Sequence, residues 1–347
     1  MARSDRFLTA CRCKPTDVTP IWLMRQAGRY MPEYRKLREK YSILEMIKNP
    51  DLATEVTLQP VHAFEVDAAI IFADILPLLE AMGLELEFIH GQGPVIHNPI
   101  SQLSDVKKLV DPLPEEALHF TLEAIEQTKK ELDGQIPLIG FSGAPFTLAC
   151  YAIEGGSSKT FHKAKTFMKA EPKAWSLLME KLSKAIGAYL SNQAKAGAQV
   201  VQLFDSWAGH LTASEYEHYV LPYSRETIQH VKTASEVPLI HFGTKTSHIL
   251  SMLKEAGGDV ISIDSDMDLA TAWSRLGSDS AIQGNLNPNI LAEGPMDIIE
   301  QEATRILNSV KGRPGHIFNL GHGILKHTPV EHVARLVEYI HRYTCSS

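Results

Sequence analysis

Two arginines four residues apart, Arg25 and Arg29, stand in the most basic stretch of the chain. Residues 25–40 contain six Lys or Arg and two Glu, a local charge of +4 in a chain whose net charge is −7. A helical turn would place both guanidinium groups on one face, where they could bind carboxylates through paired hydrogen bonds. Gly28 would let the backbone approach such a ligand. The alternative interpretation is a basic helix that faces solvent.

A single carboxylate at the end of an apolar run is the second candidate for a catalytic or ligand-binding residue. Asp74 follows Ala68–Ala73 and precedes Ile75-Leu-Pro77, which places it at the end of a predicted buried strand. Burying a carboxylate without partners is costly, so we expect hydrogen-bond donors, a cation or a ligand around it. The alternative is that Asp74 caps the helix that follows.

Tyr151 and His322 have ordinary structural interpretations as well as functional ones. Tyr151 belongs to an amphipathic stretch, residues 145–156, that ends in two glycines, so it could be a core residue. His322 stands between two glycines, as in an exposed loop. The fifteen histidines include no HExxH pattern, and Cys11 with Cys13 has no second pair. The sequence therefore predicts no metal site.

Composition and charge exclude several classes of protein. Hydrophobic residues make up 44% and charged residues 22% of the chain, values typical of a globular protein with a large core. The net charge of −7 argues against a nucleic-acid partner. The longest apolar run has six residues, whereas a membrane span needs about 20. Few cysteines and an N-terminus without a signal-peptide pattern predict a cytoplasmic protein with no membrane partner.

Eight short apolar runs, separated by helical patterns, indicate how the candidate residues are positioned. Strands that alternate with helices form parallel sheets. Eight repeats favour an α/β fold with one domain, a (β/α)8 TIM-type barrel over residues 1–347, and a doubly wound open sheet is the alternative. The runs are Pro20–Met24, Ala68–Ala73, Pro137–Phe141, Gln199–Phe204, Pro238–Phe242, Asp259–Ile263, Ser280–Gln283 and His316–Asn319.

Local patterns also predict a hairpin and the starts of three helices. Residues 84–99, after the second strand, alternate in polarity around a Gly-Gln-Gly-Pro turn, which predicts a β-hairpin insertion. Ser214 with Glu217 three residues later is a capping-box pattern. A threonine followed by proline marks the start of the last helix. The predicted helices are Ala170–Ala196, Ser214–Ala234 and Pro329–Arg342.

Polar residues follow the predicted strands, and the active sites of such barrels lie at those strand ends. About half of these residues could be ordinary turn and cap residues. The segments concerned are Arg25–Arg29, Asp74, Ser142–Pro145, Asp205–Ser206, Gly243–Thr246, Asp264–Asp266, Gly284–Asn285 and Gly321–Gly323.

Several of these segments together resemble one known family. PIWLMRQAGRYMPEYR (residues 20–35) resembles the N-terminal signature of the uroporphyrinogen decarboxylase family, and GFSGAPFTLACYAIEGG (residues 140–156) resembles its second signature. FADIL, LFDSWAG, QGNLNP and NLGHGI also match, in the family's order, over almost the whole chain. One departure is Ala73, where relatives often have a serine.

The resemblance implies a cofactor-free carboxy-lyase on a distorted (β/α)8 barrel, generally a homodimer whose two clefts face each other. The implied reaction converts the four acetate side chains of uroporphyrinogen III to methyl groups, giving coproporphyrinogen III and carbon dioxide in tetrapyrrole (haem) biosynthesis. Of the matched residues, Asp74, Arg29, Tyr151 and His322 are the implied catalytic ones. The implied substrate-binding residues are Arg25, Gln26, Ala27, Gly28, Arg29, Arg38, Asp74, Tyr151, Ser206 and His322.

Two other functions are alternatives to the decarboxylase. Some relatives with this fold are corrinoid-dependent methyltransferases that bind zinc through a His-x-Cys pattern near the fifth strand. Here that stretch reads His241-Phe-Gly-Thr-Lys245, without the thiolate. A non-catalytic tetrapyrrole carrier would not need Asp74 together with the arginine pair.

Overall fold

Seven parallel strands curl into one sheet in which each strand pairs with the next parallel strand along the chain. The computed structural model describes residues 1–89, 91–277 and 279–345. The order β1–β4–β5–β6–β7–β8–β9 never reverses, which confirms the barrel prediction and excludes a doubly wound sheet. The strands are β1 (Ala69–Ile70), β4 (Leu138–Gly143), β5 (Val200–Asp205), β6 (Leu239–Gly243), β7 (Val260–Ser262), β8 (Ala281–Gln283) and β9 (His316–Ile317).

The prediction that Pro20–Met24 forms a regular strand is wrong. The segment makes one bridge, between Ile21 and Phe318. On its other side the Ile21 carbonyl accepts from the Asp67 N–H at 2.7 Å, so the segment fills the gap between β9 and β1. A ladder does not form because Pro20 has no N–H and because the Asp67 carboxylate takes the Ile21 N–H at 2.8 Å.

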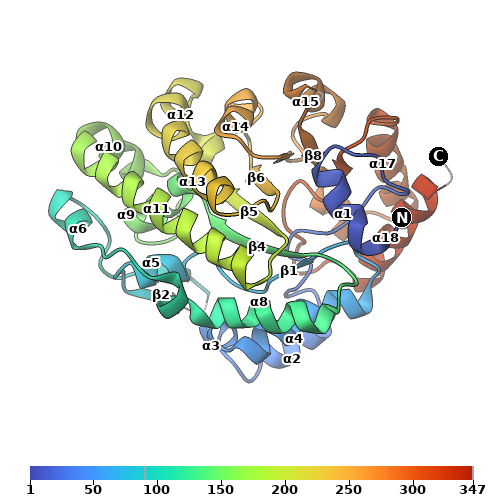
Figure 1. Ribbon diagram of the computed structural model, residues 1–347, viewed down its shortest axis with the longest axis horizontal. Coiled ribbons are helices and arrows are strands. Elements are labelled where there is room, and N and C mark those ends of the chain that lie inside the picture. Colours follow the sequence, from blue (N-terminus) through green and yellow to red (C-terminus); the bar gives the residue numbers. More distant parts are fainter. Residues whose placement is uncertain (90, 278, 346–347) are drawn as a thin grey trace.

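Helices cover the outer face of the curled sheet (Figure 1). The long helix α11 confirms the predicted Ala170–Ala196 helix, beginning two residues later, and it packs against α13 and β4. The last helix, α18, begins one residue later than predicted. The helices are α1 (Arg3–Cys11), α2 (Pro32–Arg38), α3 (Ile43–Lys48), α4 (Pro50–Ala63), α5 (Pro77–Ala81), α6 (Leu103–Lys108), α7 (Pro114–Ala117), α8 (His119–Leu132), α9 (Pro145–Glu154), α10 (His162–Ala170), α11 (Pro172–Ala196), α12 (Ala213–Tyr219), α13 (Leu221–Ala234), α14 (Leu250–Ala256), α15 (Leu269–Leu276), α16 (Pro288–Glu293), α17 (Met296–Ser309) and α18 (Val330–Cys345), with a 3-10 turn at Ala208–His210.

The predicted helix Ser214–Ala234 is two helices, and its predicted cap is wrong by two residues. Thr212, not Ser214, is the N-cap of α12: its hydroxyl accepts from the Glu215 N–H at 3.2 Å, and the Glu215 carboxylate accepts from the Thr212 N–H at 2.9 Å. Both pairs fit the capping-box pattern, so the sequence alone could not separate them. The helix breaks at Val220 and restarts with Pro222 in the first turn of α13, where a proline costs no hydrogen bond.

This cap yields a stability prediction with a matched control. Thr212→Ala removes the hydroxyl that satisfies a free N–H of α12, and we expect it to lower the free energy of unfolding by about 1 kcal/mol. Ser214→Ala deletes the same group from within the helix, where it caps nothing, and should change stability much less. Denaturant unfolding of both variants tests this, and a larger loss in the Ser214 variant would contradict the cap.

The predicted hairpin is confirmed. Strands β2 (Leu86–Ile89) and β3 (Gly93–Ile96) pair antiparallel, with Leu86 opposite Ile96. The hairpin is fastened to the end of α9, where the Ile96 N–H donates to the Gly155 carbonyl at 2.9 Å. A Cβ on the next residue, Gly156, would lie 2.6 Å from the Pro94 carbonyl oxygen. The two glycines therefore let the hairpin pack closely on this corner, beside the strand ends.

Side chains fill the inside of the barrel. Trp22, Ile240 and Val260 are fully buried in this inner core. Hydrogen bonds join several polar groups there: Trp22 Nε1 donates to Gln283 Oε1 at 2.8 Å, and Gln283 Nε2 donates to Ser262 Oγ at 3.0 Å. A ligand must therefore bind at the ends of the strands rather than within the barrel. None of the helices in the described part of the chain combines the length and apolar character needed to cross a membrane.

Candidate active site

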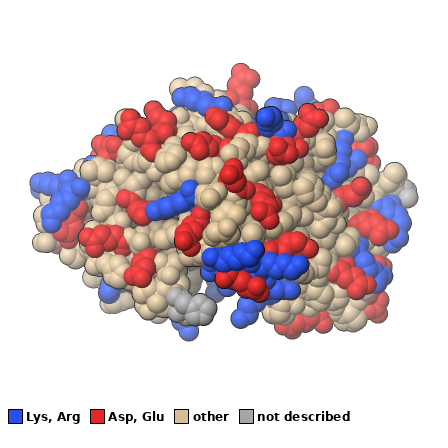
Figure 2. Space-filling model, turned by 90° about the horizontal axis from the view of Figure 1, so that it is seen from below, with Lys and Arg blue, Asp and Glu red and all other residues tan. Residues whose placement is uncertain are grey.

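A cavity of about 1220 Å³ opens at the carboxyl ends of the strands. Its walls come from the segment after Met24, the ends of β1 and β5, the loop after β9, the α2–α3 region and the hairpin. Ligand pockets commonly measure about 300–1,000 Å³, so this one has room for a large ligand. Figure 2 shows Lys and Arg side chains gathered over α2 beside a hollow in the surface.

Nine of the ten residues predicted for the site line this one cavity, although they come from six separate segments. Gln26 is the exception. It is fully buried, its Oε1 accepts from the Leu23 N–H at 3.0 Å, and its Nε2 donates to the Ala68 carbonyl at 3.0 Å. Gln26 thus ties the arginine loop to the start of β1, and its side chain does not reach the cavity. The lining residues are Arg25, Ala27, Gly28, Arg29, Arg38, Asp74, Tyr151, Ser206 and His322.

The expected helical turn at Arg25–Arg29 is wrong, because this stretch is a loop with turns. Arg25 has a left-handed φ of 63°, which a helix does not allow. Its side chain passes close over Gly323, where a Cβ would lie 2.4 Å from the Arg25 Cδ. The loop is also held by Met24, whose N–H donates to Asn319 Oδ1 at 3.0 Å. Arg25 therefore reaches the cavity from a fixed backbone.

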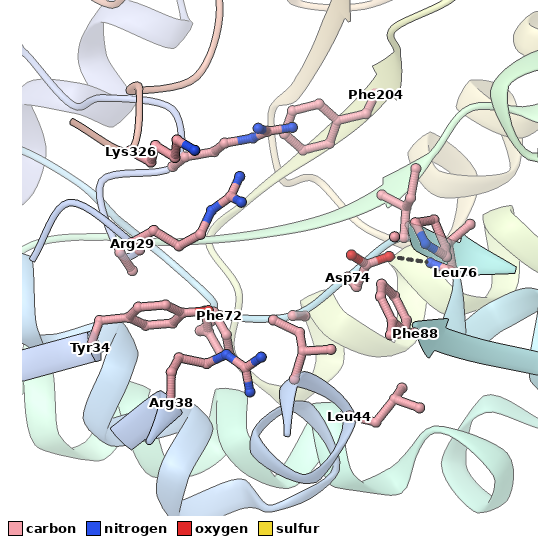
Figure 3. Close-up of a pocket in the computed structure, with 18 of the residues that line it drawn as sticks. Arg29, Tyr34, Arg38, Leu44, Phe72, Asp74, Leu76, Phe88, Phe204 and Lys326 are labelled. Carbon is pink, nitrogen blue, oxygen red and sulfur yellow. Dashed lines mark hydrogen bonds between the residues drawn. The ribbon is translucent and has the colours of Figure 1, made fainter. Parts of the chain in front are cut away.

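Several cations enter the cavity, and among the described residues Arg25, Arg29 and Lys326 make no ion pair. Burial, followed by the nearby charge of Arg29, lowers the pKa of Arg25, while Asp74 acts in the opposite direction. Lys326 lines the same space, and Figure 3 shows Arg29 and Lys326 on one side of the cavity with Asp74 across from them. Like charges gathered in one cavity repel, and a polyanionic ligand would relieve that repulsion.

Arg38 lies at the end of α2, farther along the cavity wall. Its guanidinium donates to the Tyr41 carbonyl, which holds the side chain against the turn after α2. In Figure 3 it lies beside Tyr34 and Phe72. The structure places Arg38 on the cavity wall, and its binding of a ligand stays a prediction.

Asp74 is partly exposed to the cavity and otherwise enclosed by protein. Its Oδ1 accepts from the Leu76 N–H at 2.9 Å, drawn as the dashed line in Figure 3. Burial raises the pKa of the Asp74 carboxyl, and the Leu76 hydrogen bond and the charge of Arg25 offset part of this. The alternative that Asp74 caps the next helix is wrong, because α5 begins at Pro77 with Leu76 as its N-cap. The hydrogen bond from Leu76 uses only Oδ1. A carboxylate oxygen therefore remains available to a ligand.

Tyr151 and Trp207 form an aromatic wall beside Asp74. Their ring centroids are 4.2 Å apart with an interplanar angle of 37°. Burial raises the pKa of Tyr151 to about 12, and the charge of Asp74 adds to the effect. The phenol is therefore protonated at neutral pH and can donate a hydrogen bond. Ser206, next to Trp207, follows β5, and its carbonyl accepts from Thr244 Oγ1 at 2.6 Å.

His322 presents a defined tautomer to the cavity. Its Nδ1 accepts from the Gly323 N–H at 2.7 Å, so the proton of the neutral ring is on Nε2. Burial, and then the charge of Arg25, lowers the pKa of His322, which favours the neutral ring at physiological pH. Nε2–H is thus a second hydrogen-bond donor to a ligand, alongside Tyr151.

Comparison with known proteins identifies the family. The sequence profile described as "Uroporphyrinogen decarboxylase (URO-D)" matches residues 2–343. The chain belongs to the uroporphyrinogen decarboxylase family. A relative from Roseiflexus sp. strain RS-1, named uroporphyrinogen decarboxylase, is 52% identical over 98% of this chain and 99% of its own length. One from Chloroflexus aggregans with the same name is 54% identical over 98% of this chain and 96% of its own.

Solved structures share the fold at low sequence identity. A methyltransferase from Methanosarcina mazei superposes with a TM-score of 0.81 at 21% identity and covers 99% of each chain. A B12-independent methionine synthase from Shewanella sp. W3-18-1 gives a TM-score of 0.59 at 9% identity, over 96% of this chain and 98% of its own. Both show the barrel architecture and nothing about the chemistry of this chain.

The cavity also contains residues that the sequence did not single out. Phe88 comes from the hairpin, which the sequence indicated only as an insertion. Lys326 lies four residues beyond His322 in the same loop, a spacing that could have drawn attention to it. The other missed residues include apolar and aromatic ones of the wall, such as Tyr34, Leu44, Phe72, Phe204 and Trp207.

Of the segment that would bind zinc in a corrinoid-type enzyme, Phe242 lines the cavity but His241 does not. His241 is fully buried in β6, and its Nε2 is 3.8 Å from the Asp205 carboxylate. Within residues 1–89, 91–277 and 279–345, no three His, Cys, Asp or Glu side chains are grouped as metal ligands. His241 therefore belongs to a buried polar pair rather than to the ligand-facing wall.

Proposed function

We propose that this chain decarboxylates the four acetate side chains of uroporphyrinogen III to methyl groups, giving coproporphyrinogen III and carbon dioxide in haem and related tetrapyrrole biosynthesis. The relatives of about half-identical sequence bear the name of this activity. The observation that carries the proposal is one carboxylate, Asp74, facing Arg25 and Arg29 within a cavity of about 1220 Å³. A cation-rich space of this size suits an octacarboxylate macrocycle.

The arginines and Asp74 bind different parts of this substrate. Guanidinium groups of Arg25, Arg29 and Arg38 bind its carboxylates in bidentate fashion. The four pyrrole N–H groups point to the centre of the macrocycle, where the Asp74 oxygens accept from them. These hydrogen bonds also offset the desolvation free energy of a partly buried, charged carboxylate. The ring then lies over Asp74 with its acid side chains among the cations.

The substrate supplies the electron sink that decarboxylation requires. A pyrrole protonated at carbon becomes a cation, which accepts the electron pair left as carbon dioxide departs. Asp74 beneath the ring stabilises that cation. At about 4 Å and an effective dielectric constant near 20, the attraction is about 4 kcal/mol. If expressed mainly in the transition state, it supplies roughly three orders of magnitude in rate.

Tyr151, Ser206 and His322 complete the binding wall. The Tyr151 hydroxyl and the His322 Nε2–H donate to substrate carboxylates, with Ser206 beside them after β5. Arg29, Tyr151, His322 and bound water are the candidates for delivering the proton at carbon. Ala27 and Gly28 contribute backbone surface between the two arginines.

The proposal includes a cytoplasmic homodimer of one-domain chains spanning residues 1–347, with clefts that face each other. Four cysteines, none in a disulfide within the described residues, suit a reducing compartment. The test of the activity is incubation of the purified chain with uroporphyrinogen under anaerobic conditions, with chromatography of the products. Stepwise loss of carboxylates supports the decarboxylase, whereas binding without turnover supports the carrier alternative.

We also expect turnover without any metal or organic cofactor, because the protonated pyrrole serves as the electron sink. Exhaustive chelation and dialysis should leave kcat and KM unchanged within about twofold, a difference too small to represent a lost Lewis acid. A thermal unfolding scan of the chelated protein controls for loss of fold. Turnover that disappears and returns on addition of zinc would overturn this expectation.

A further inference from the structure

We propose that Lys326 binds a propionate carboxylate of the substrate at the mouth of the cavity, in a subsite separate from the Arg25–Arg29 pair. The inference rests on the proposed function, since it concerns how that substrate is held. It starts from the geometry of one loop, residues 321–329, which follows β9 and carries both His322 and Lys326.

The Lys326 side chain is exposed and lines the cavity. Within the described residues it makes no hydrogen bond or ion pair, unlike its neighbour His327, which pairs with Glu293 at 3.3 Å. Figure 3 shows its amino group on the side of the cavity from which Arg29 also enters, opposite Asp74. The ammonium is therefore free to meet an anion that lies over Asp74.

The backbone on both sides of Lys326 is fixed. The Ile324 N–H donates to the Met24 carbonyl at 2.9 Å, next to Arg25 in the chain. The Thr328 N–H donates to the Leu325 carbonyl at 3.1 Å, which makes residues 325–328 a tight turn with Lys326 at its first corner. Lys326 is thus connected to the same backbone that positions Arg25, and the position of its Cα atom is defined.

Lys326 adds one more cation to those that the arginine pair brings to the cavity. Arg25, Arg29 and Lys326 approach one space, while Asp74 is committed to the pyrrole N–H groups. An uncompensated ammonium at the mouth attracts the substrate on approach and gains a partner once the substrate is bound. Because Lys326 is exposed, this contact is screened by salt and should affect binding more than the chemical step.

The chemistry of the reaction selects a propionate over an acetate. A cation paired with the acetate that loses carbon dioxide would stabilise the reactant carboxylate more than the transition state, and so would slow the reaction. Propionates keep their charge through all four decarboxylations. Lys326 at the mouth can therefore hold a propionate in every turnover without opposing the loss of carbon dioxide.

Steady-state kinetics of charge variants test the subsite. We expect Lys326→Gln to raise KM by about three- to tenfold and Lys326→Glu to raise it further, with kcat changed less than about twofold in the first. Lys326→Arg keeps the charge and should restore KM. Lys184→Gln, an exposed lysine on α11 outside the cavity lining, removes the same charge and should leave KM unchanged.

The number of carboxylates on the substrate separates propionate from acetate. With a propionate contact, Lys326→Gln raises KM by the same factor for the octacarboxylate substrate and for the pentacarboxylate intermediate. A rise for the octacarboxylate alone, or an unchanged KM in both the Gln and Glu variants, overturns the proposal. Wild-type chain that yields no product would overturn the proposed function itself, so the two failures are distinguishable.

Discussion

Replacing Asp74 with asparagine is expected to lower kcat by about two to three orders of magnitude while substrate binding changes much less. Asparagine keeps the size of the side chain and one acceptor oxygen, so it can still accept hydrogen bonds from pyrrole N–H groups. It has no negative charge to stabilise the cationic pyrrole. The loss should therefore appear in single-turnover rates at saturating substrate rather than in the binding constant.

The glutamate variant tests the position of the charge rather than its presence. Asp74→Glu should also lose activity, because an extra methylene moves the carboxylate by more than the roughly 0.5 Å that such a site tolerates. If Asp74 only positions the ring, asparagine should raise KM and leave kcat normal. An Asn variant that binds poorly but turns over normally once saturated would refute charge stabilisation.

Stability measurements separate loss of charge from loss of fold in these variants. Burial raises the pKa of Asp74 in the folded chain, so the folded chain binds this proton more tightly than the unfolded chain. The ionised carboxylate therefore lowers stability as the pH rises through the folded-state pKa. Asp74→Asn has no charge to desolvate, so at neutral pH it should be at least as stable as the wild type. A marked loss of stability would assign Asp74 a structural role.

The fold was largely predictable because buried parallel strands leave a clear signature. Seven of the eight apolar runs became strands in the expected order, and the hairpin formed where its turn was predicted. Pro20–Met24 failed because its strand pairing depends on Asp67, a distant carboxylate that competes for the Ile21 N–H. No pattern within the segment itself contains that information.

The site was predictable where a residue type has few structural uses and not where it has many. Asp74 at the end of an apolar run and two arginines in an acidic chain are unusual enough to point to a ligand. Gln26 was included in the predicted site because it lies in the matched stretch, but its side-chain amide makes hydrogen bonds to the backbone of Leu23 and Ala68 instead. The aromatic wall was missed because Phe and Trp are ordinary core residues until the fold shows which of them face a cavity.

Removing the guanidinium of Arg25 or Arg29 is expected to lower kcat/KM by about one and a half to three and a half orders of magnitude in each case. Once the bound substrate covers such a charge pair, truncating one partner costs about 2–5 kcal/mol, because the other charge is left unpaired. Arg25 should show the larger effect, since burial and Arg29 already lower its pKa and its stem packs over Gly323. Kinetics of Arg25→Ala and Arg29→Ala measure this.

Lysine replacements, with a distant arginine variant as the control, distinguish the bidentate hydrogen-bonding geometry of arginine from the effect of charge alone. Arg25→Lys and Arg29→Lys should recover only part of the lost kcat/KM, because an ammonium does not reproduce two parallel hydrogen bonds to one carboxylate. Arg12→Ala, an exposed arginine after α1 and outside the cavity lining, should leave the kinetics unchanged. Full recovery with lysine would mean that the cations act as point charges, as proposed for Lys326. Unchanged kinetics in both alanine variants would remove the arginine pair from the site, and the polyanionic substrate would then need another anchor.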